Sequence, residues 1–404
     1  MSVFRALSRR SFALLWSGQT ISRLGDSLYT IALAWWVLEK TGSATAMGIV
    51  LICSTTPMLL LLLIGGVAVD RFPRVRLMLA SDLTRGMVVG IIALLAFTQR
   101  LELWQLCTMS AIFGLVEAFF YPAYTAAIPD LVPTEYLPSA NSLRSISLQV
   151  AQIFGPGIGA AIIALGGTPL AFALDGASFV ISAACLVVLP SKPVQGDSIS
   201  KERTSALHDL QTGISTVLQS PWLWVTIAVA CVSTIFLSGP DEAVLPLLVK
   251  ERFGTQVGLY ALLTSLSALG SISAALWLGH FKRLWRRGLL VYGAWILASL
   301  MLLVAGLPLP ASIISLAFLI QGASYTSLGL AWINTLQEFV PASRLGRVAS
   351  IDMLVSTALA PIGYGLAGIA ADRLGAAPVF VLGGAISAGV IAMGLVHPAV
   401  RAVD

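Results

Sequence analysis

Long apolar runs cover almost the whole chain, and only short polar stretches separate them. A helix needs about 20 residues to cross the hydrocarbon core of a membrane, and twelve of the runs reach roughly that length. We therefore expect spanning helices at about 12–38, 44–69, 77–98, 103–128, 139–165, 168–190, 221–248, 255–279, 288–308, 310–337, 346–369 and 376–396. The pattern predicts an all-α, polytopic membrane protein.

One long polar connection divides these spans into six and six. We expect an N-terminal six-helix bundle at 1–190, a cytoplasmic linker at 191–220 and a C-terminal six-helix bundle at 221–404. The halves also repeat, because residues 130–143 (DLVPTEYLPSANSL) align without gaps with residues 338–351 (EFVPASRLGRVASI), 208 positions later. Repeats of this parallel kind occur in secondary transporters.

Composition supports a membrane protein. Hydrophobic residues make up 57% of the chain and charged residues 11%, against roughly 25% charged in an ordinary soluble domain. The basic residues behind the formal charge of +5 are spread over loops, so we expect membrane lipid rather than nucleic acid as the anionic partner. The four cysteines lie in apolar stretches without metal-like spacing, and we expect no metal site.

Lys and Arg are concentrated in the loops on the side of the two termini, which predicts cytoplasmic N- and C-termini in a multi-pass inner-membrane protein. One such loop, after the second span, has the spacing GxxxDRxxRxR and comprises Gly66, Asp70, Arg71, Arg74 and Arg76. Its positive charges hold the turn on the cytoplasmic side. A glycine at this place lets another helix approach closely, and the carboxylate suits the positive N-terminal end of a neighbouring helix.

This loop resembles the loop between the second and third helices of the major facilitator superfamily. The resemblance implies two six-helix pseudo-repeats that work by alternating access. It also implies that Asp70 docks near residues 344–352 and locks the halves together on the cytoplasmic side. Arg144 and Asp352 occupy equivalent repeat positions with opposite charge, and we expect them to pair at the same gate. The loop after the eighth span, LGHFKRLWRRG, keeps the basic residues without the aspartate.

The fifth span carries a ridge of small residues that ends in the sequence GPGIG, with Gly155, Pro156 and Gly159. Such a ridge predicts close packing against another helix. GPGIG also resembles the GPxxG motif in the fifth helix of superfamily exporters. The stretch GLVEAFFYPAYTAAIPDLVPTEYLPSAN at 114–141, together with WSGQTISRLGD in the first span, EKTGSA at 39–44 and ALDGASF in the sixth span, resembles the branch that includes macrolide efflux proteins and the enterobactin exporter. The resemblance implies proton antiport that exports a hydrophobic or amphipathic small molecule, such as a drug or siderophore.

Charges inside the spans need an explanation, because each costs at least ~2.5 to 3.5 kcal/mol at mid-membrane. Asp26 and Glu117 are the candidates for proton coupling or substrate binding. Arg23, three residues before Asp26, allows the alternative of a permanent ion pair. We interpret Asp175, Asp241 and Glu242 as gating or helix-end residues rather than coupling residues, and we expect Asp82 to pair locally with Arg85. Deep aromatic residues suit either substrate contact or core packing, namely Phe119, Tyr124, Tyr325 and Trp332.

Motifs of other function classes are missing from the sequence. The chain has no GxxxxGK[ST] loop for ATP and no HExxH or GxSxG motif. We therefore expect no enzyme and no cofactor, with the proton gradient as the energy source and a small molecule as the partner of a functional monomer. Uptake transport and lipid transport by the same fold are the alternatives to export, and a membrane-embedded enzyme ranks behind them.

Overall fold

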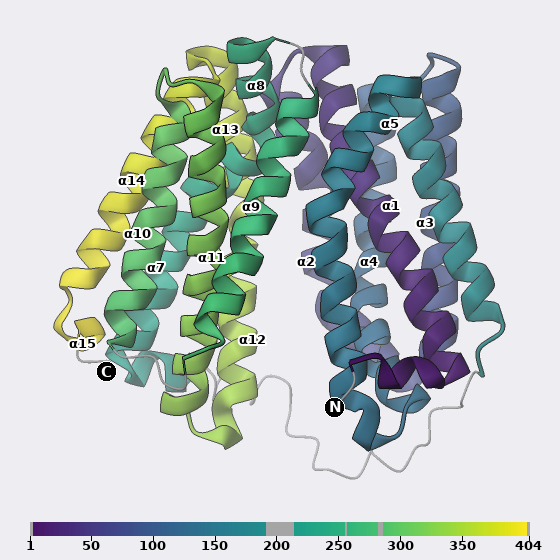
Figure 1. Ribbon diagram of the computed structural model, residues 1–404. Helices are drawn as coiled ribbons and strands as arrows, with labels where there is room; N and C mark the ends of the chain where they lie inside the picture. The colour runs from purple at the N-terminus through teal and green to yellow at the C-terminus, as the bar shows by residue number, and fades with distance from the viewer. Residues whose placement is uncertain (1–2, 191–213, 255–256, 282–285, 402–404) are drawn as a thin grey trace. The chain divides into compact units, whose positions relative to one another are not determined.

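The computed structural model describes residues 3–190, 214–254, 257–281 and 286–401. Within these ranges the regular structure is helical and no strand occurs (Figure 1). The longer helices are α1 (Arg10–Thr41), α2 (Ala44–Arg71), α3 (Arg74–Phe97), α4 (Leu103–Leu131), α5 (Leu137–Val187), α7 (Pro221–Ser238), α8 (Leu245–Phe253), α9 (Val257–Leu278), α10 (Arg287–Gly306), α11 (Ala311–Phe339), α12 (Ala342–Ala358), α13 (Ala360–Leu374) and α14 (Ala376–Val396).

The described helices agree with the twelve expected spans. Ten helical stretches in these ranges are long and apolar enough to cross a membrane. One of them contains the 51 residues of α5, which hold two spans because Gly167 leaves the helical conformation with φ 75° and ψ 177°. Only glycine adopts this backbone conformation without strain. The 32-residue α1, which carries Arg23 and Asp26, is a further helix of spanning length.

Shorter elements complete the described chain. Val3–Ser8 and Thr134–Tyr136 are 3₁₀ helices, Gly239–Val244 is a π-helical segment between α7 and α8, and α15 is Pro398–Arg401. Of the predicted linker, residues 191–213 lie outside the described residues, and residues 214–219 are helical. Part of the basic loop after the eighth span, residues 282–285, also lies outside them.

The described residues form two compact units. The first comprises Met1–Gly42, Ile49–Gly196 and Val257–Ser265, as far as these segments are described. The second comprises Ser43–Gly48, Asp197–Gln256 and Leu266–Asp404, again within the described ranges. The first unit therefore contains α1, α3, α4, α5 and most of α2, and the second contains α7, α8 and α10 to α15.

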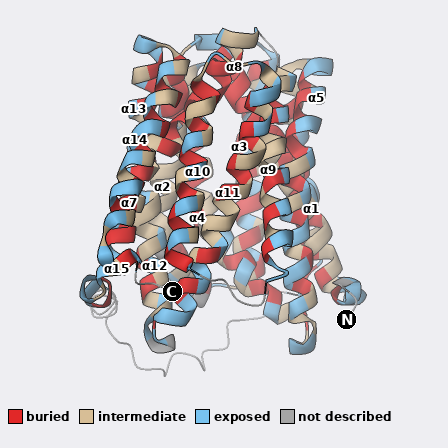
Figure 2. Ribbon diagram, turned by 60° about the vertical axis from the view of Figure 1, so that its left-hand side comes forward, coloured by how far each residue is buried: buried red, intermediate tan, exposed pale blue. Residues whose placement is uncertain are grey.

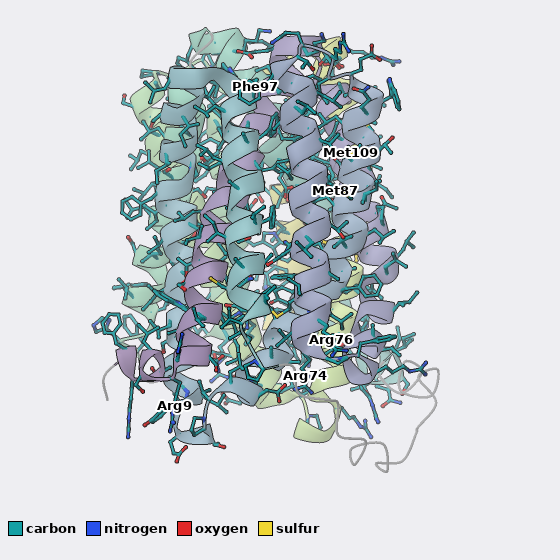
Figure 3. The ribbon with its side chains drawn as sticks, turned by 90° about the vertical axis from the view of Figure 1, so that its right-hand side faces the viewer. Arg9, Arg74, Arg76, Met87, Phe97 and Met109 are labelled. Atoms are coloured by element: carbon teal, nitrogen blue, oxygen red, sulfur yellow. The ribbon has the colours of Figure 1, made fainter. Side chains whose placement is uncertain are left out.

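The outer surfaces of the helices are apolar, as a lipid environment requires. Figure 2 shows exposed residues along the whole length of many helices, and large apolar side chains such as Leu165 (86% exposed) are among them. In the first unit, Arg9, Arg74 and Arg76 lie at one end, while Met87 and Phe97 lie progressively nearer the other (Figure 3). The basic residues at the start of α3 thus lie at the same end of this unit as Arg9.

Each unit contains the same close helix contact. In the first unit a Cβ added to Gly114 on α4 would clash with the carbonyl oxygen of Ser54 on α2. In the second unit a Cβ added to Gly322 on α11 would clash with the carbonyl oxygen of Ser267 on α9. Gly114 and Gly322 are 208 positions apart, which is the offset of the sequence repeat. The two units therefore repeat in their packing as well as in their sequence.

Candidate functional site

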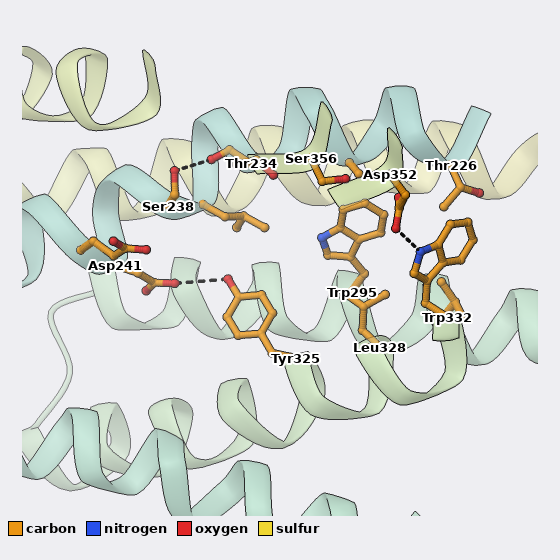
Figure 4. Close-up of a pocket in the computed structure, with 15 residues that line it drawn as sticks. Thr226, Thr234, Ser238, Asp241, Trp295, Tyr325, Leu328, Trp332, Asp352 and Ser356 are labelled. Atoms are coloured by element: carbon orange, nitrogen blue, oxygen red, sulfur yellow. Dashed lines mark hydrogen bonds between the residues drawn. The ribbon is translucent and has the colours of Figure 1, made fainter. Parts of the chain in front are cut away.

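A cavity of about 450 Å³ lies inside the second unit, and residues of α7, α10, α11, α12 and the π-helical segment line it (Figure 4). Three carboxylates and three aromatic side chains contribute to its wall. They are Asp241, Glu242, Asp352, Trp295, Tyr325 and Trp332. None of the described residues that line this cavity is Lys or Arg, so the cavity is electronegative.

Asp241 is held in place by α11. Gln321 Nε2 donates hydrogen bonds to Asp241 Oδ1 (3.2 Å) and Oδ2 (3.1 Å), and Tyr325 Oη donates to Oδ2 (3.2 Å). The π-helical segment adds a residue to the turn and re-aims the side chains that follow, and such insertions recur at functional sites. Gly239, which begins this segment, lies so close to the Gly363 carbonyl group that a Cβ would clash with it. The local backbone and the neighbouring helix together set the direction of Asp241.

The other two carboxylates also accept a hydrogen bond each from an aromatic side chain. Tyr364 Oη donates to Glu242 Oε2 at 2.8 Å. Trp332 Nε1 donates to Asp352 Oδ2 at 2.8 Å. A cavity lined by both carboxylates and aromatic rings has the composition that binds organic cations, because both groups attract positive charge and the rings supply apolar contact. The cavity is therefore chemically suited to an ammonium group on an amphipathic molecule.

A buried ion pair ties the first unit together. Arg85 Nη2 lies 2.5 Å from Asp82 Oδ1, and both side chains are almost fully buried. Gln19 and Ser182 donate hydrogen bonds to Asp82 Oδ2 at 3.3 and 2.7 Å, and the Arg85 guanidinium lies 4.0 Å from the Phe120 ring centroid. The predicted local pair is confirmed, and its partners come from α1, α4 and α5 as well as α3.

Asp26 lies near this network, and none of the described side chains forms an ion pair with it. Its Oδ1 atom is buried and has no hydrogen-bond partner among the described residues. The charges of Arg85, Arg23 and Glu117 act on it, but the ion pairs among the described side chains include no contact between Arg23 and Asp26. The alternative of a permanent Arg23–Asp26 pair is thus absent from this structure. The charges of Arg23 and Glu117 both act on Asp26, and the coupling role of these residues stays a prediction.

Comparison with known proteins identifies the family. The family model of the Major Facilitator Superfamily matches residues 15–364. The chain belongs to the major facilitator superfamily. It is a transporter of this superfamily and not an enzyme, and it crosses the membrane several times.

Curated relatives of this superfamily chain include efflux pumps. Macrolide efflux protein A of Streptococcus pyogenes is 27% identical over 395 residues, which is 96% of each chain. The multidrug efflux pump Tap of Mycolicibacterium fortuitum is 28% identical over 392 residues, which is 94% of each chain. These relatives support the efflux branch that the sequence motifs indicate.

Solved structures share the fold. A bacterial homologue of the iron transporter ferroportin in an inward-facing state has a TM-score of 0.75 at 15% identity, and the match covers 96% of this chain and 99% of the other. The nucleoside transporter NupG has a TM-score of 0.73 at 12% identity, with 95% and 98% covered. At these identities the likeness concerns the superfamily fold alone.

The superfamily loop motif lies at the end of α2 and the start of α3. Arg74 pairs with Asp130 at 2.7 Å and donates to the Ala126 carbonyl oxygen at 2.9 Å, so it joins α3 to α4. Arg71 and Arg76 are exposed, and the side chain of Asp70 lies outside the described residues.

The close helix approach that the motif suggested at Gly66 occurs one residue earlier. A Cβ on Gly65 would clash with the Ala118 carbonyl oxygen, whereas a Cβ on Gly66 would meet no described heavy atom within 4 Å. Docking of Asp70 and pairing of Arg144 with Asp352 remain predictions.

The exporter motif lies where α5 packs against α1. A Cβ on Gly155 would clash with the side chain of Ser27, and Ser27 Oγ donates to the Ala151 carbonyl oxygen at 3.2 Å. A Cβ on Gly159 would lie 3.5 Å from Ile31, in ordinary contact, and Pro156 is buried between the two glycines. The close packing predicted for this ridge is therefore present.

The candidate aromatic residues separate into three positions. Tyr325 and Trp332 line the cavity of the second unit, Tyr124 lines a cavity of the first unit, and Phe119 lines neither of these two. The sequence predicted gating or helix-end roles for Asp241 and Glu242 and gave no role to Trp295, although all three line the larger cavity. The adjacent Gly239 and Pro240, inside an apolar span and next to two carboxylates, were the available signal of a broken helix.

Proposed function

We propose that this chain exports a small amphipathic molecule that carries a positive charge, in exchange for protons. The observation that carries the proposal is the second-unit cavity, in which Asp241, Glu242 and Asp352 lie beside Trp295, Tyr325 and Trp332 without a basic residue among the lining side chains. A cation bound there gains both carboxylate attraction and ring contacts.

Export is the direction that the relatives support, since macrolide efflux protein A and the pump Tap both match almost the whole chain. The GPGIG sequence of α5 agrees with this direction. Accumulation of substrate inside expressing cells, rather than exclusion, would contradict it.

Proton coupling is assigned to Asp26 and Glu117 in the first unit. Asp26 has a buried oxygen without a partner and no ion pair among the described side chains. Burial favours the neutral form of a carboxyl group, so such a group can bind a proton in one state and release it in another. The proton gradient then supplies the energy, and no bound cofactor is required.

The cytoplasmic gate is assigned to the loop motif with Asp70 and to the oppositely charged residues Arg144 and Asp352. Cytoplasmic termini and an inner-membrane location complete the proposal, because the basic loops lie on the side of the termini. Replacing Asp70 by Asn should slow transport while the amount of protein inserted in the membrane stays the same.

Reconstituted protein tests the proposal directly. Vesicles that contain the full chain are given a pH gradient with the interior acidic, and the uptake of ethidium, a flat aromatic cation, is followed by fluorescence. We expect uptake that a proton-exchanging ionophore abolishes, together with ethidium-stimulated release of protons from the vesicles. Ethidium movement that ignores the pH gradient would rule out proton antiport. Binding of a neutral dye of similar size, but not of ethidium, would rule out the cation site.

A further inference from the structure

The first unit contains a second cavity, of about 330 Å³, whose charge is opposite to that of the cavity in the second unit. Two arginines, two tyrosines and two amides account for much of its wall. They are Arg23, Arg144, Tyr121, Tyr124, Gln19 and Asn141. No Asp or Glu occurs among its described lining residues. The wall therefore presents two permanent positive charges and several hydrogen-bond donors.

Both arginines lack a carboxylate partner among the side chains that the structure describes. The Arg144 guanidinium lies 5.3 Å from the ring centroid of Tyr124 and 5.6 Å from that of Tyr121. Ring contacts of this kind offset part of the cost of burying a cation and leave its N–H groups available. The charges of Asp26 and Arg23 interact, but the two side chains do not form an ion pair. The N–H groups of both guanidinium groups can therefore donate hydrogen bonds to a ligand.

The backbone around the cavity is held by hydrogen bonds between α1 and α5. Trp16 Nε1 donates to the Leu143 carbonyl oxygen at 3.0 Å, next to Arg144 in sequence. The hydroxyl groups of Thr20 and Ser147 are 2.7 Å apart. These contacts position both arginine-bearing helices before any ligand arrives, which lowers the ordering cost of binding.

The internal repeat shows that the two cavities are equivalent features of the fold. Tyr124 and Arg144 line the cavity of the first unit, and the residues 208 positions later, Trp332 and Asp352, line the cavity of the second. In the first unit the Arg144 guanidinium lies 5.3 Å from the Tyr124 ring centroid, and in the second unit Asp352 accepts a hydrogen bond from the indole N–H of Trp332. A charge that only set membrane topology would lie in a loop, whereas Arg144 lies about two turns inside α5.

We propose that the cavity of the first unit binds an anionic group, a carboxylate or a phosphate, through the guanidinium groups of Arg23 and Arg144. The planar guanidinium fork matches both oxyanions and can donate two parallel hydrogen bonds to each. This site is additional to the proposed cation site and lies on different residues. The anion comes either from a free solute or from the headgroup of an amphiphile.

Binding to the purified full chain in an uncharged detergent tests the proposal. The probe is decyl phosphate, and decyltrimethylammonium, with the same tail, is the cationic comparison. We expect Arg144→Gln and Arg23→Gln each to weaken decyl phosphate binding at least about tenfold, because one charge-assisted fork is lost. Arg100→Gln, which changes an exposed arginine outside the cavity, should leave binding unchanged. Equal affinities in all three variants would overturn the proposal.

Further variants keep the test decisive if Arg144→Gln does not fold. Arg144→Lys retains the charge but loses the fork, and it should bind decyl phosphate with an affinity between those of the unmodified chain and Arg23→Gln. Unchanged affinity in both Arg144→Lys and Arg23→Gln would refute the site. Melting temperatures of the variants separate lost binding from lost folding.

Competition identifies the source of the anion. Displacement of decyl phosphate by inorganic phosphate alone indicates a free solute, and displacement only by phosphatidylglycerol in nanodiscs indicates a lipid headgroup. Both results support the site, whereas displacement only by decyltrimethylammonium refutes it. Asp241→Asn should weaken decyltrimethylammonium binding and spare decyl phosphate, so failure of the cation site and failure of the anion site are distinguishable.

Discussion

Tyr325 donates a hydrogen bond to Asp241 at 3.2 Å, although the two residues lie 84 positions apart and on different elements. Together with Gln321, it fixes a carboxylate of the π-helical segment in the wall of the second-unit cavity. Because the orientation of this carboxylate is already fixed, binding a cation does not carry the free-energy cost of ordering its side chain.

Replacing Asp241 by Asn should weaken ethidium binding at least about tenfold, because the amide keeps the size of the side chain and removes its negative charge. Tyr325→Phe removes only one hydrogen bond to the carboxylate and should have a smaller effect. Fluorescence titration of each purified variant measures its affinity for ethidium. Glu135→Gln changes an exposed carboxylate outside the cavity and is the matched control. An equal loss of affinity in Asp241→Asn and Glu135→Gln would point to a general charge effect.

Replacing Asp26 by Asn, or Glu117 by Gln, should reduce ethidium-stimulated proton movement to background, because the amide cannot take up or release a proton. Ethidium binding should persist, since neither residue lines the cavity of the second unit. A pH-sensitive dye inside proteoliposomes gives the proton flux. Normal coupling in both variants would mean that another residue couples transport to protons, and Asp175, a fully buried carboxylate of this unit, would be examined next.

Replacing Arg85 by Met should lower the free energy of unfolding by about 3 to 5 kcal/mol, because Asp82 is left buried without its ion-pair partner. Arg74→Met is a matched control, since the Arg74–Asp130 pair is 30% and 38% exposed and such pairs contribute about 0 to 1 kcal/mol. Denaturant titration in detergent compares the two. Similar losses in both variants would mean that burial of the Asp82–Arg85 pair has no special consequence for stability.

Replacing Gly155 by Val should destabilise the chain by about 1 to 3 kcal/mol, because the added atoms overlap with Ser27 on α1 and push α1 away from α5. Gly157→Val is the matched change two residues later, where a Cβ meets no described heavy atom within 4 Å, and it should be tolerated. The melting temperature and the yield of folded protein are measured for both variants. Equal tolerance of the two valines would show that the small-residue ridge does not require this contact.

Several features could be predicted from the chain because they depend on local patterns. The break between the fifth and sixth spans follows from a run of small residues at Gly166 and Gly167, and the structure confirms it at Gly167. The Asp82–Arg85 pair follows from a three-residue spacing on one helix. The close contact of Gly155 follows from the small-residue spacing of its span.

The roles of Asp241 and Arg144 depended instead on contacts across long separations. The sequence predicts a gating or helix-end role for Asp241, and only the fold shows that Gln321 and Tyr325 of α11 donate hydrogen bonds to it. The sequence predicts Arg144 as a gate residue that pairs with Asp352, and only the fold shows that two tyrosine rings of α4 lie next to its guanidinium group. No periodicity in the sequence encodes such pairs.

By itself, the sequence determined the all-helical membrane fold, its spans, its internal repeat and its family, because length, hydropathy and short motifs are properties of neighbouring residues. The tertiary structure alone decided which charges share a cavity and which are paired. The reason is physical, since the surroundings of a side chain inside a helical membrane protein come from helices that are distant in the chain, and their rotation and separation determine whether a carboxylate meets an arginine, a tyrosine or open space.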